Sequence, residues 1–268
     1  MEPDHRASIQ RASNSTPSIH DRRSESRRRG RELIVAVAYL QDEPSPRIMR
    51  YREAHSVPCT GDLTDVFPCR DASATIVIAD VCGKDEQAHD HARYLRNAVR
   101  ALADDYSPAA VLDRVNLAFS RRIAEFGDDR FASIFIATVT GRRLAYASAG
   151  HDFALMVGSD GRHRHLPPTG AIVGVNEGES YGERTLGVAA PDWLILVTDG
   201  ITDARDTDGT FFGTEGVARH ALRAVRAGID DPAARILEGA RKHGGDRFVD
   251  DASVLCVSFS KWPRRCAA

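Results

Sequence analysis

The sequence predicts an α+β fold in which strands occur in runs and helices are inserted in pairs. Apolar, β-branched runs such as residues 74–81 and 193–198 have the length and composition of buried strands. Two stretches with apolar residues at helical spacing, about residues 86–103 and 108–126, follow the first of these runs. A parallel doubly wound sheet would need single strands and helices in strict alternation, so a layered α+β sandwich is favoured.

Length and composition predict one domain with short tails. The chain has 268 residues, of which 42% are hydrophobic, which suffices for one sizeable core. Residues 1–31 are rich in Ser and Arg and poor in large apolar side chains, which is typical of a disordered basic tail. Acidic residues interrupt this stretch and no apolar segment follows it, so a solvated tail is favoured over a transit peptide or a nucleic-acid-binding arm. We expect a folded domain over residues 32–260 and a C-terminal tail over residues 261–268.

The charge balance and the cysteines exclude several classes of protein. The 36 basic residues are offset by 38 acidic ones, so the net charge of -2 gives no general attraction for nucleic acid. The five cysteines show no CxxC spacing, which predicts neither a disulfide framework nor a zinc site and fits a reducing cytoplasm. The apolar runs are far shorter than the ~20 residues of a membrane-spanning helix. We therefore expect a cytoplasmic protein with no membrane or nucleic-acid partner.

Further elements are expected on both sides of the central helices. Residues 33–40 and 47–52 are expected to form a hairpin around the turn-prone residues 42–46. Glycine-containing turns separate three later strands and predict an antiparallel meander over residues 132–140, 143–148 and 153–157. Two more helices and a last strand are expected at about residues 214–227, 232–243 and 253–259.

Four aspartates lie at predicted strand ends or glycine turns: Asp62, Asp80, Asp199 and Asp250. Carboxylates from distant segments suit Mg²⁺ or Mn²⁺, which prefer oxygen ligands in octahedral geometry and keep several waters. Two such ions ~3.5–4 Å apart can bridge one water, lower its pKa and direct the hydroxide at phosphorus, so no protein nucleophile is needed. Each aspartate alone also fits a turn or a cap. The ordered set is what favours a metal site.

Several segments, in this order along the chain, match the motifs of one known family. They are residues 61–67 (GDLTDVF), 80–84 (DVCGK), 131–135 (FASIF), 149–151 (AGH), 198–205 (TDGITDAR), 209 with 212–213 (G and FG) and 250–253 (DDAS). From about Val57 to Val257 the chain resembles the bacterial PP2C-like (PPM) phosphatases of the SpoIIE and RsbU type, which dephosphorylate phosphoserine on anti-sigma-factor antagonists. The resemblance implies a PP2C-like α-β-β-α sandwich of two antiparallel sheets flanked by helices, with metals in the cleft between the sheet edges.

The resemblance also implies a role for each candidate residue. Two Mn²⁺ or Mg²⁺ ions would be bound, with Asp80 contacting both and with Asp199 and Asp250 completing one of them. Asp62 and the main-chain carbonyl of Val81 would bind the other ion, and the water between the ions would attack the phosphate. Beside these ligands, supporting hydrogen bonds or packing are expected from Asp65, Gly200 and Asp251, although Asp65 also fits a plain turn residue.

Three residues depart from the family pattern, and one histidine has an open role. The usual Gly-Gly-Asp is here Thr60-Gly61-Asp62, which keeps the aspartate. The usual Ser-Gly-Lys-Gly is here Cys82-Gly83-Lys84-Asp85, and Asp85 would stiffen the turn and place a charge beside the cleft. Cys82 is expected to be a small buried side chain rather than a reactive or metal-binding thiolate. His151 could donate a proton to the leaving serine oxygen, but a histidine after Ala-Gly at a strand end is more often structural.

The sequence therefore favours a metal-dependent protein serine/threonine phosphatase that acts on a phosphorylated regulatory protein of the anti-sigma-factor antagonist type. The alternative is a catalytically weak PP2C-like module that only binds a partner, although all four candidate ligands are retained. A kinase or ATPase is not supported, because no GxxxxGK[ST] loop is present. The sequence leaves the oligomeric state open, with a dimer among the alternatives.

Overall fold

Every pairing between named strands is antiparallel, and the pairings build two separate sheets. The computed structural model describes residues 20–28, 31–39, 47–53, 60–71, 73–245, 248 and 250–259. The larger sheet has seven strands in the order β1-β2-β3-β12-β11-β8-β9. They are β1 (His20–Arg28), β2 (Arg31–Tyr39), β3 (Arg47–Glu53), β8 (Ala154–Val157), β9 (His163–His165), β11 (Trp193–Val197) and β12 (Ala252–Ser258).

The smaller sheet has five strands in the order β10-β7-β6-β5-β4. They are β4 (Asp62–Pro68), β5 (Ala74–Val81), β6 (Ala132–Thr140), β7 (Arg143–Ala149) and β10 (Arg184–Gly187). Asp62 at the start of β4 lies directly opposite Asp80 near the end of β5, and Asp80 lies opposite Ser133 in β6. This register places Asp62 and Asp80, the predicted acidic residues of β4 and β5, side by side at the same end of the smaller sheet.

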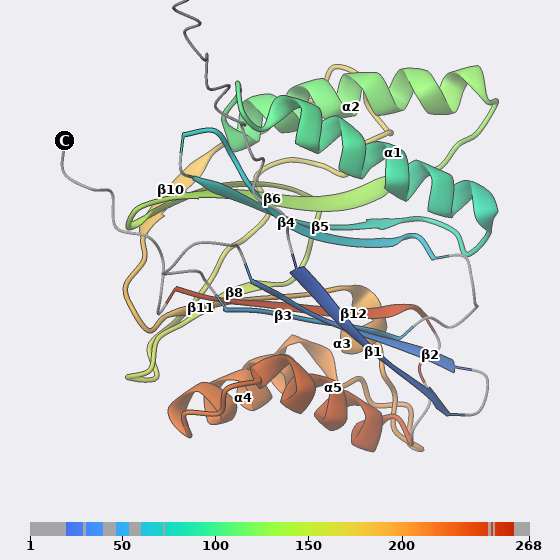
Figure 1. The fold of residues 1–268 in the computed structure, drawn as a ribbon. Helices are drawn as coiled ribbons and strands as arrows, with labels where there is room; N and C mark the ends of the chain where they lie inside the picture. Colours follow the sequence, from blue (N-terminus) through green and yellow to red (C-terminus); the bar gives the residue numbers. More distant parts are fainter. Residues whose placement is uncertain are drawn as a thin grey trace, which may run out of the picture.

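Two helix pairs cover the outer faces of the sheets. The helices α1 (Glu86–Leu102) and α2 (Pro108–Glu125) cover the smaller sheet, and α4 (Gly213–Arg226) and α5 (Pro232–His243) cover the larger one (Figure 1). The Asp85 carboxylate accepts a 2.9 Å hydrogen bond from the Ala88 main-chain N and so caps α1. A short helix, α3 (Asp199–Thr202), follows β11 directly.

Three apolar layers hold the four layers of secondary structure together. The middle layer lies between the two sheets and contains Phe135, whose ring stacks on Tyr146 with 5.3 Å between the ring centroids. A second layer, which includes Leu95 and Phe119, lies between the α1–α2 pair and the smaller sheet. A third layer lies between the α4–α5 pair and the larger sheet. The predicted α-β-β-α sandwich is therefore confirmed.

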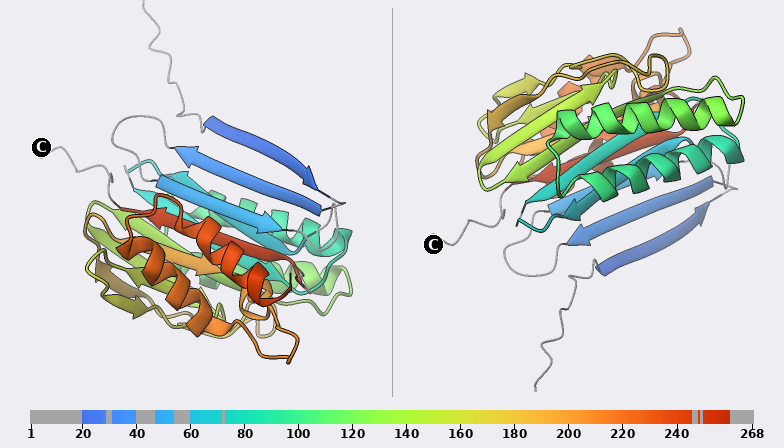
Figure 2. Two further views of the ribbon diagram at one scale, coloured as in Figure 1. Left: turned by 90° about the horizontal axis from the view of Figure 1, so that it is seen from below. Right: turned by 90° about the horizontal axis from the view of Figure 1, so that it is seen from above.

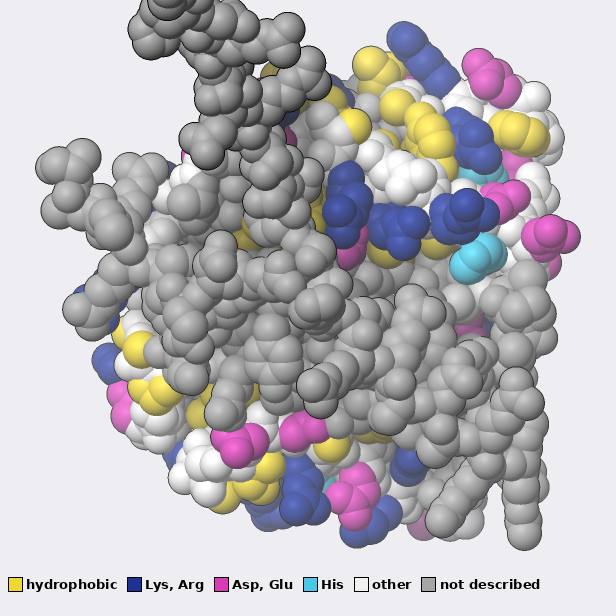
Figure 3. Space-filling model, in the orientation of Figure 1, with side chains coloured by type: hydrophobic (Ala, Val, Ile, Leu, Met, Phe, Trp, Pro, Cys, Tyr) yellow, Lys and Arg dark blue, Asp and Glu magenta, His cyan; other side chains and the backbone are white. Residues whose placement is uncertain are grey.

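The two views in Figure 2 show the helix pairs lying across their sheets, and they show β1 and β2 extending the larger sheet beyond the helices. Figure 3 shows side chains of both charge signs on the outer faces of the helix layers that are visible there. None of the helices in the described part of the chain combines the length and the apolar composition that a bilayer crossing requires.

The expected elements are found with boundaries shifted by one or two residues, but two expectations are wrong. The antiparallel meander expected over residues 132–140, 143–148 and 153–157 ends after β7, because the chain then crosses to the larger sheet, where β8 pairs with β9 and β11. The hairpin of β2 and β3 is present, while its turn lies outside the described residues. The strand β1 (His20–Arg28) falls in the stretch that was expected to be a disordered tail, where it pairs with β2 through the main chain. Cross-strand main-chain hydrogen bonds do not need apolar side chains, so composition gave no sign of this strand. Residues 1–19 and 261–268 of the expected tails lie outside the described residues.

Candidate active site

A cleft of about 480 Å³ lies where the ends of strands from both sheets meet. Its walls come from the end of β5, the start of β6, the turn between β7 and β8, the helix α3 and the residues before β12. Aspartates from four separate segments line it: Asp80, Asp152, Asp199, Asp203, Asp250 and Asp251. Three of the four aspartates predicted as metal ligands, together with Val81, therefore lie in one cleft, although they come from distant segments of the chain.

Asp80 and Val81 form the end of β5 and are held there by close main-chain contacts. The Val81 main-chain N donates to the Gly61 carbonyl oxygen at 3.2 Å, and Cys82 N donates to the Phe131 carbonyl oxygen at 2.9 Å. A Cβ atom on Gly61 would overlap the Val81 carbonyl oxygen, so only glycine allows this approach. The Val81 carbonyl, a predicted metal ligand, is therefore fixed at the rim of the cleft.

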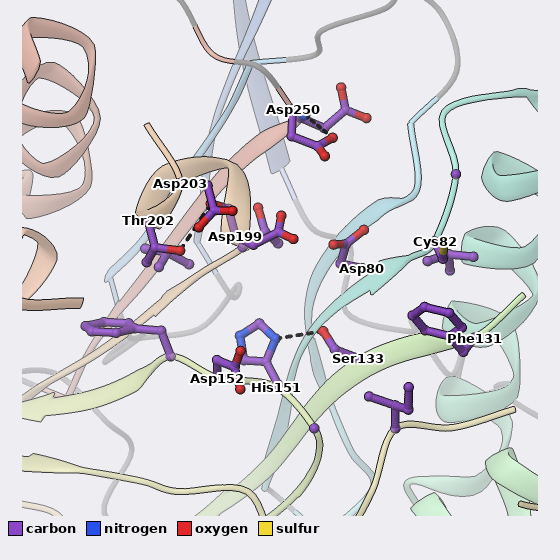
Figure 4. A pocket seen from close by; sticks show the side chains of 18 of the residues that line it. Asp80, Cys82, Phe131, Ser133, His151, Asp152, Asp199, Thr202, Asp203 and Asp250 are labelled. Carbon is purple, nitrogen blue, oxygen red and sulfur yellow. Dashed lines mark hydrogen bonds between the residues drawn. The ribbon is translucent and has the colours of Figure 1, made fainter. Parts of the chain in front are cut away.

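Asp199 and Asp250 are brought together by the pairing of β11 with β12. Thr198 N donates to the Ser253 carbonyl oxygen at 3.1 Å, which continues the ladder to the ends of both strands. A Cβ atom on Gly200 would overlap the Asp251 carbonyl oxygen, so glycine lets α3 lie against the segment before β12. Figure 4 shows the side chains of Asp80 and Asp199 pointing toward one another across the cleft, with Asp250 on the same side as Asp199.

The carboxylates in the cleft repel one another. Burial, followed by the negative charges of Asp199, Asp250 and Asp251, raises the pKa of Asp80 to about 7. Partial burial and the charge of Asp250 also raise the pKa of Asp199. Raised pKa values in several neighbouring carboxyl groups mark a place where negative charge is in excess, and a bound cation would relieve it.

Lys84 supplies the positive charge on the wall of the cleft, and it is the one Lys or Arg among the lining residues. Its ammonium nitrogen lies 3.0 Å from Asp250 Oδ1. The charge of Lys84 also lowers the pKa values of Asp80 and Asp199, against the larger effects that raise them. No role was predicted for Lys84, because the sequence around it does not form a GxxxxGK[ST] phosphate-binding loop.

Asp62 lies behind the cleft rather than in its wall. The side chain is 4% exposed, and Asp62 is not among the lining residues. Its Oδ2 accepts a 2.9 Å hydrogen bond from the Thr198 hydroxyl. Burial, and then the charge of Asp80, raise the pKa of Asp62 well above 3.8. The two carboxylates are thus close enough to interact, although Asp80 alone faces the cleft.

Asp65, Gly200 and Asp251 were expected to support the ligands, and the structure places them differently from one another. Asp65 is buried away from the cleft and forms a two-pronged ion pair with Arg100 of α1, at 2.6 Å and 3.0 Å. Gly200 and Asp251 contact each other at the cleft, where Asp251 raises the pKa values of Asp80 and Asp62. Asp65 therefore links β4 to α1 instead of lining the site.

His151 and Cys82 also line the cleft. His151 is 2% exposed, lies 3.2 Å from the Ser133 hydroxyl, and has its pKa lowered to about 4 by burial. An imidazole with so low a pKa is neutral at pH 7, which favours the structural interpretation over that of a proton donor. The Cys82 side chain is exposed, so the expectation of a buried cysteine is wrong. It lies on the loop that joins β5 to α1.

The donor set fits a hard divalent cation. The cleft offers carboxylate and carbonyl oxygens, whereas Cys82 is its only thiol, and its acidic groups carry excess negative charge. No group of three or more Asp, Glu, His or Cys side chains within the described ranges encloses an ion by itself. Mg²⁺ usually keeps several of its waters and is bound through one or two carboxylates, so the site does not need three side chains gathered around the ion.

Sequence reasoning missed several residues of the cleft. Asp203, one helical turn after Asp199, belongs to the matched segment 198–205, and Asp152 directly follows the matched segment 149–151, so their positions could have identified them. Phe131 and Ile172 give one side of the cleft an apolar lining. Ile172 comes from the long connection between β9 and β10, which has no periodic pattern from which its position could be read.

One curated relative is similar over the domain. Protein IcfG of Synechocystis sp. (strain ATCC 27184 / PCC 6803 / Kazusa) is 28% identical over 192 residues, which cover 62% of this chain and 30% of IcfG. The chain thus aligns with about a third of that protein's length.

Solved structures share the fold. The RsbU and RsbW domains of Rv1364c from Mycobacterium tuberculosis superpose with a TM-score of 0.65 at 24% identity, covering 78% of this chain and 58% of theirs. The catalytic domain of the serine/threonine protein phosphatase PstP, solved in complex with two manganese ions, has a TM-score of 0.60 at 16% identity, covering 80% and 97%. At such identities the similarity shows the fold alone.

The model of the family described as Stage II sporulation protein E (SpoIIE) matches residues 70–260. This range contains β5 to β12, all five helices and every aspartate that lines the cleft. The match covers most of the chain, and the resemblance to PP2C-like phosphatases of the SpoIIE and RsbU type is confirmed. The chain belongs to the SpoIIE family.

Proposed function

We propose that this protein is a metal-dependent protein serine/threonine phosphatase. The observation that carries the proposal is the meeting of Asp80, Asp199 and Asp250, from three distant segments, in one cleft with excess negative charge. Membership of the SpoIIE family supports the same activity. The manganese ions of the structurally similar PstP support a divalent cation as the cofactor.

The cofactor would be two Mn²⁺ or Mg²⁺ ions. Asp80, Asp199, Asp250 and the Val81 carbonyl would hold them, because all four lie at the cleft. Asp62 stays a predicted ligand, since its carboxylate lies behind Asp80 and within range of its charge. When bound, such ions supply a water of lowered pKa and neutralise charge on the phosphate.

The protein's own side chains would bind and orient the phosphoserine or phosphothreonine. The ammonium of Lys84 lies on the wall of the cleft, where it would attract a phosphate dianion against the surrounding carboxylates. Phe131 and Ile172 would contact apolar atoms of the substrate chain, because they form the apolar side of the cleft. Neutral His151 would keep its place beneath the site through Ser133 rather than transfer a proton.

The substrate we propose is a phosphorylated anti-sigma-factor antagonist in a partner-switching pathway. The support is the family and the similarity to the RsbU-containing structure of Rv1364c. A cytoplasmic location is proposed with it, since Cys69, Cys82 and Cys256 of the described residues form no disulfide.

The test is hydrolysis of p-nitrophenyl phosphate by the purified protein with Mn²⁺, with Mg²⁺ and with EDTA. Metal-dependent turnover is expected in the parent protein and is expected to be lost in Asp80→Asn and Asp199→Asn. Asp105→Asn, which removes an exposed carboxylate outside the cleft, is the matched control and should keep parental activity. A folded parent protein that is inert with both metals would favour a partner-binding module instead.

A further inference from the structure

The loop of residues 82–85 joins β5 to α1 and carries Lys84 along the wall of the cleft. It belongs to no strand or helix, so its position depends on contacts at its two ends. The first end is held by the main-chain hydrogen bond from Cys82 N to the Phe131 carbonyl oxygen, at 2.9 Å. The second end is Asp85, the residue at which this chain departs from the glycine of its family.

Asp85 is held by Arg130 through two parallel hydrogen bonds. Arg130 Nη1 donates to Asp85 Oδ1 and Nη2 donates to Oδ2, both at 2.7 Å. This two-pronged geometry is the strongest and most directional form of an ion pair. The guanidinium also crosses over Gly83, where a Cβ atom would overlap it. The hydrogen bonds to Arg130 are the largest of the effects that hold the pKa of Asp85 far below its ordinary value.

Arg130 is itself held by the buried carboxylate of Asp128. Its Nε lies 3.2 Å from Asp128 Oδ2, and the same oxygen lies 3.0 Å from His91 Nε2 of α1. The side chains of Arg130, Asp128 and His91 are 17%, 7% and 1% exposed. The guanidinium therefore binds Asp85 through its two Nη atoms while its Nε is held by a buried carboxylate. The side chains of an ordinary surface ion pair have no such buried partner and are more flexible.

We propose that Arg130 is a positioning residue, which acts through Asp85 to fix the loop of residues 82–85 so that Lys84 and the Val81 carbonyl stay against the carboxylates of the cleft. The inference rests on one part of the proposed function, the binding of a divalent cation in the cleft, and does not need the phosphatase activity. Asp85 thus stabilises the loop, and its charge beside the cleft is already neutralised by Arg130. A glycine at position 85 has no side chain with which to make this contact.

The test is the affinity for Mn²⁺ alone, measured without substrate from the electron paramagnetic resonance signal of free Mn²⁺. In Arg130→Gln and in Arg130→Lys the dissociation constant is expected to rise by roughly tenfold, as for other residues that orient metal ligands. For Arg130→Gln, the direction of the change in Mn²⁺ affinity distinguishes a loosened loop from a simple effect of charge. Removal of a positive charge beside an acidic cleft would by electrostatics alone tighten Mn²⁺ binding, whereas a loosened loop weakens it.

Hydrogen exchange of the main-chain amides gives a second readout, which needs no metal. In EDTA, a peptide that spans residues 82–89 is expected to exchange faster in Arg130→Gln than in the parent. Asp85→Ser keeps a good N-cap for α1 but removes the pair, so it should show both effects. The double variant Asp85→Ser/Arg130→Gln should be no worse than either single variant, because both remove one interaction.

Arg70→Gln is the control for loss of an arginine ion pair elsewhere, since Arg70 forms an exposed pair with Asp104, at 2.8 Å, and does not line the cleft. It should leave both the Mn²⁺ affinity and the exchange of residues 82–89 unchanged. The proposal is overturned if folded Arg130→Gln binds Mn²⁺ as tightly as the parent, or if its loop exchanges at the parental rate. A parent that binds Mn²⁺ without hydrolysing phosphate would refute the phosphatase activity and leave this comparison intact. A parent that binds no Mn²⁺ would refute both.

Discussion

The Thr198 hydroxyl donates a 2.9 Å hydrogen bond to Asp62 Oδ2, and its oxygen accepts a 2.9 Å hydrogen bond from Ser253 N. Asp62 begins β4 of the smaller sheet, whereas Thr198 directly follows β11 and Ser253 lies in β12, both strands of the larger sheet. One hydroxyl group therefore connects the two sheets directly behind the cleft. This contact helps to hold the buried Asp62 carboxylate, which lies opposite Asp80 in the sheet.

Replacement of Thr198 by valine removes this connection while keeping the shape of the side chain. The loss leaves a buried carboxylate and a main-chain N–H without this partner, so the free energy of unfolding should fall by about 1–3 kcal/mol. Urea denaturation monitored by circular dichroism measures the change. Thr185→Val, at a residue on an exposed strand, should change stability by less than about 0.5 kcal/mol. Equal stabilities of the two variants would contradict the importance of the contact.

Replacement of Gly61 by alanine should weaken metal binding by displacing the Val81 carbonyl. Its Cβ would overlap the Val81 carbonyl oxygen, so β4 and β5 must separate and the carbonyl must move. We expect Mn²⁺ affinity to fall by roughly tenfold. Isothermal titration calorimetry provides the measurement. Gly178→Ala is the control, because the nearest atom to its Cβ would be 3.7 Å away. Unchanged affinity in Gly61→Ala would show that the Val81 carbonyl does not matter for metal binding.

The metal-free protein should gain stability when Asp80 is replaced by asparagine. The pKa of Asp80 is raised from 3.8 to about 7, so its favourable contribution is complete below pH 3.8 and is lost as the pH rises through 7. In EDTA at pH 8, Asp80→Asn should therefore unfold with a free energy about 1–3 kcal/mol higher than the parent. The difference should shrink toward pH 5. A parent that is as stable as the variant at pH 8 would contradict the mutual repulsion of the carboxylates.

His151 should stay neutral well below pH 6. Burial lowers its pKa from 6.5 to about 4, so the stability that it contributes is present above pH 6.5 and is lost as the pH falls toward 4. Nuclear magnetic resonance of the imidazole nitrogens gives the titration midpoint directly. A midpoint near 6.5 in the folded protein would show that His151 reaches solvent and would restore it as a candidate proton donor.

The sequence predicted those parts of the fold whose side chains repeat with the period of their element. The stripe on α1, with Leu95 and Val99, is buried as expected, and the run of β5 forms a central strand. The strand β1 has no such signal, because its sequence, HDRRSESRR, holds no apolar residue and main-chain pairing defines the strand. The short strands β9 and β10 are largely exposed, so they also lack an apolar pattern.

The site was predicted as a set of acidic strand ends, and the structure places Asp80, Asp199 and Asp250 in one cleft. The sequence could not predict which of the predicted aspartates faces the cleft and which is buried behind it. Nothing in the local sequence distinguishes the cleft-facing Asp80 from the buried Asp62 opposite it. The pair of Asp85 and Arg130 joins residues 45 positions apart, which no periodicity relates. Contacts of this kind depend on how β5 and β6 are aligned in the folded sheet.

The central claim is that the acidic cleft uses divalent cations to hydrolyse a phosphoserine ester. The most direct test is phosphate release from a phosphoserine peptide as a function of Mn²⁺ concentration, for the parent and for Asp80→Asn. We predict a rate that saturates with Mn²⁺ in the parent and falls by roughly a hundredfold or more in the variant. A folded parent that binds Mn²⁺ yet releases no phosphate, or an Asp80→Asn variant with the parental rate, would contradict it.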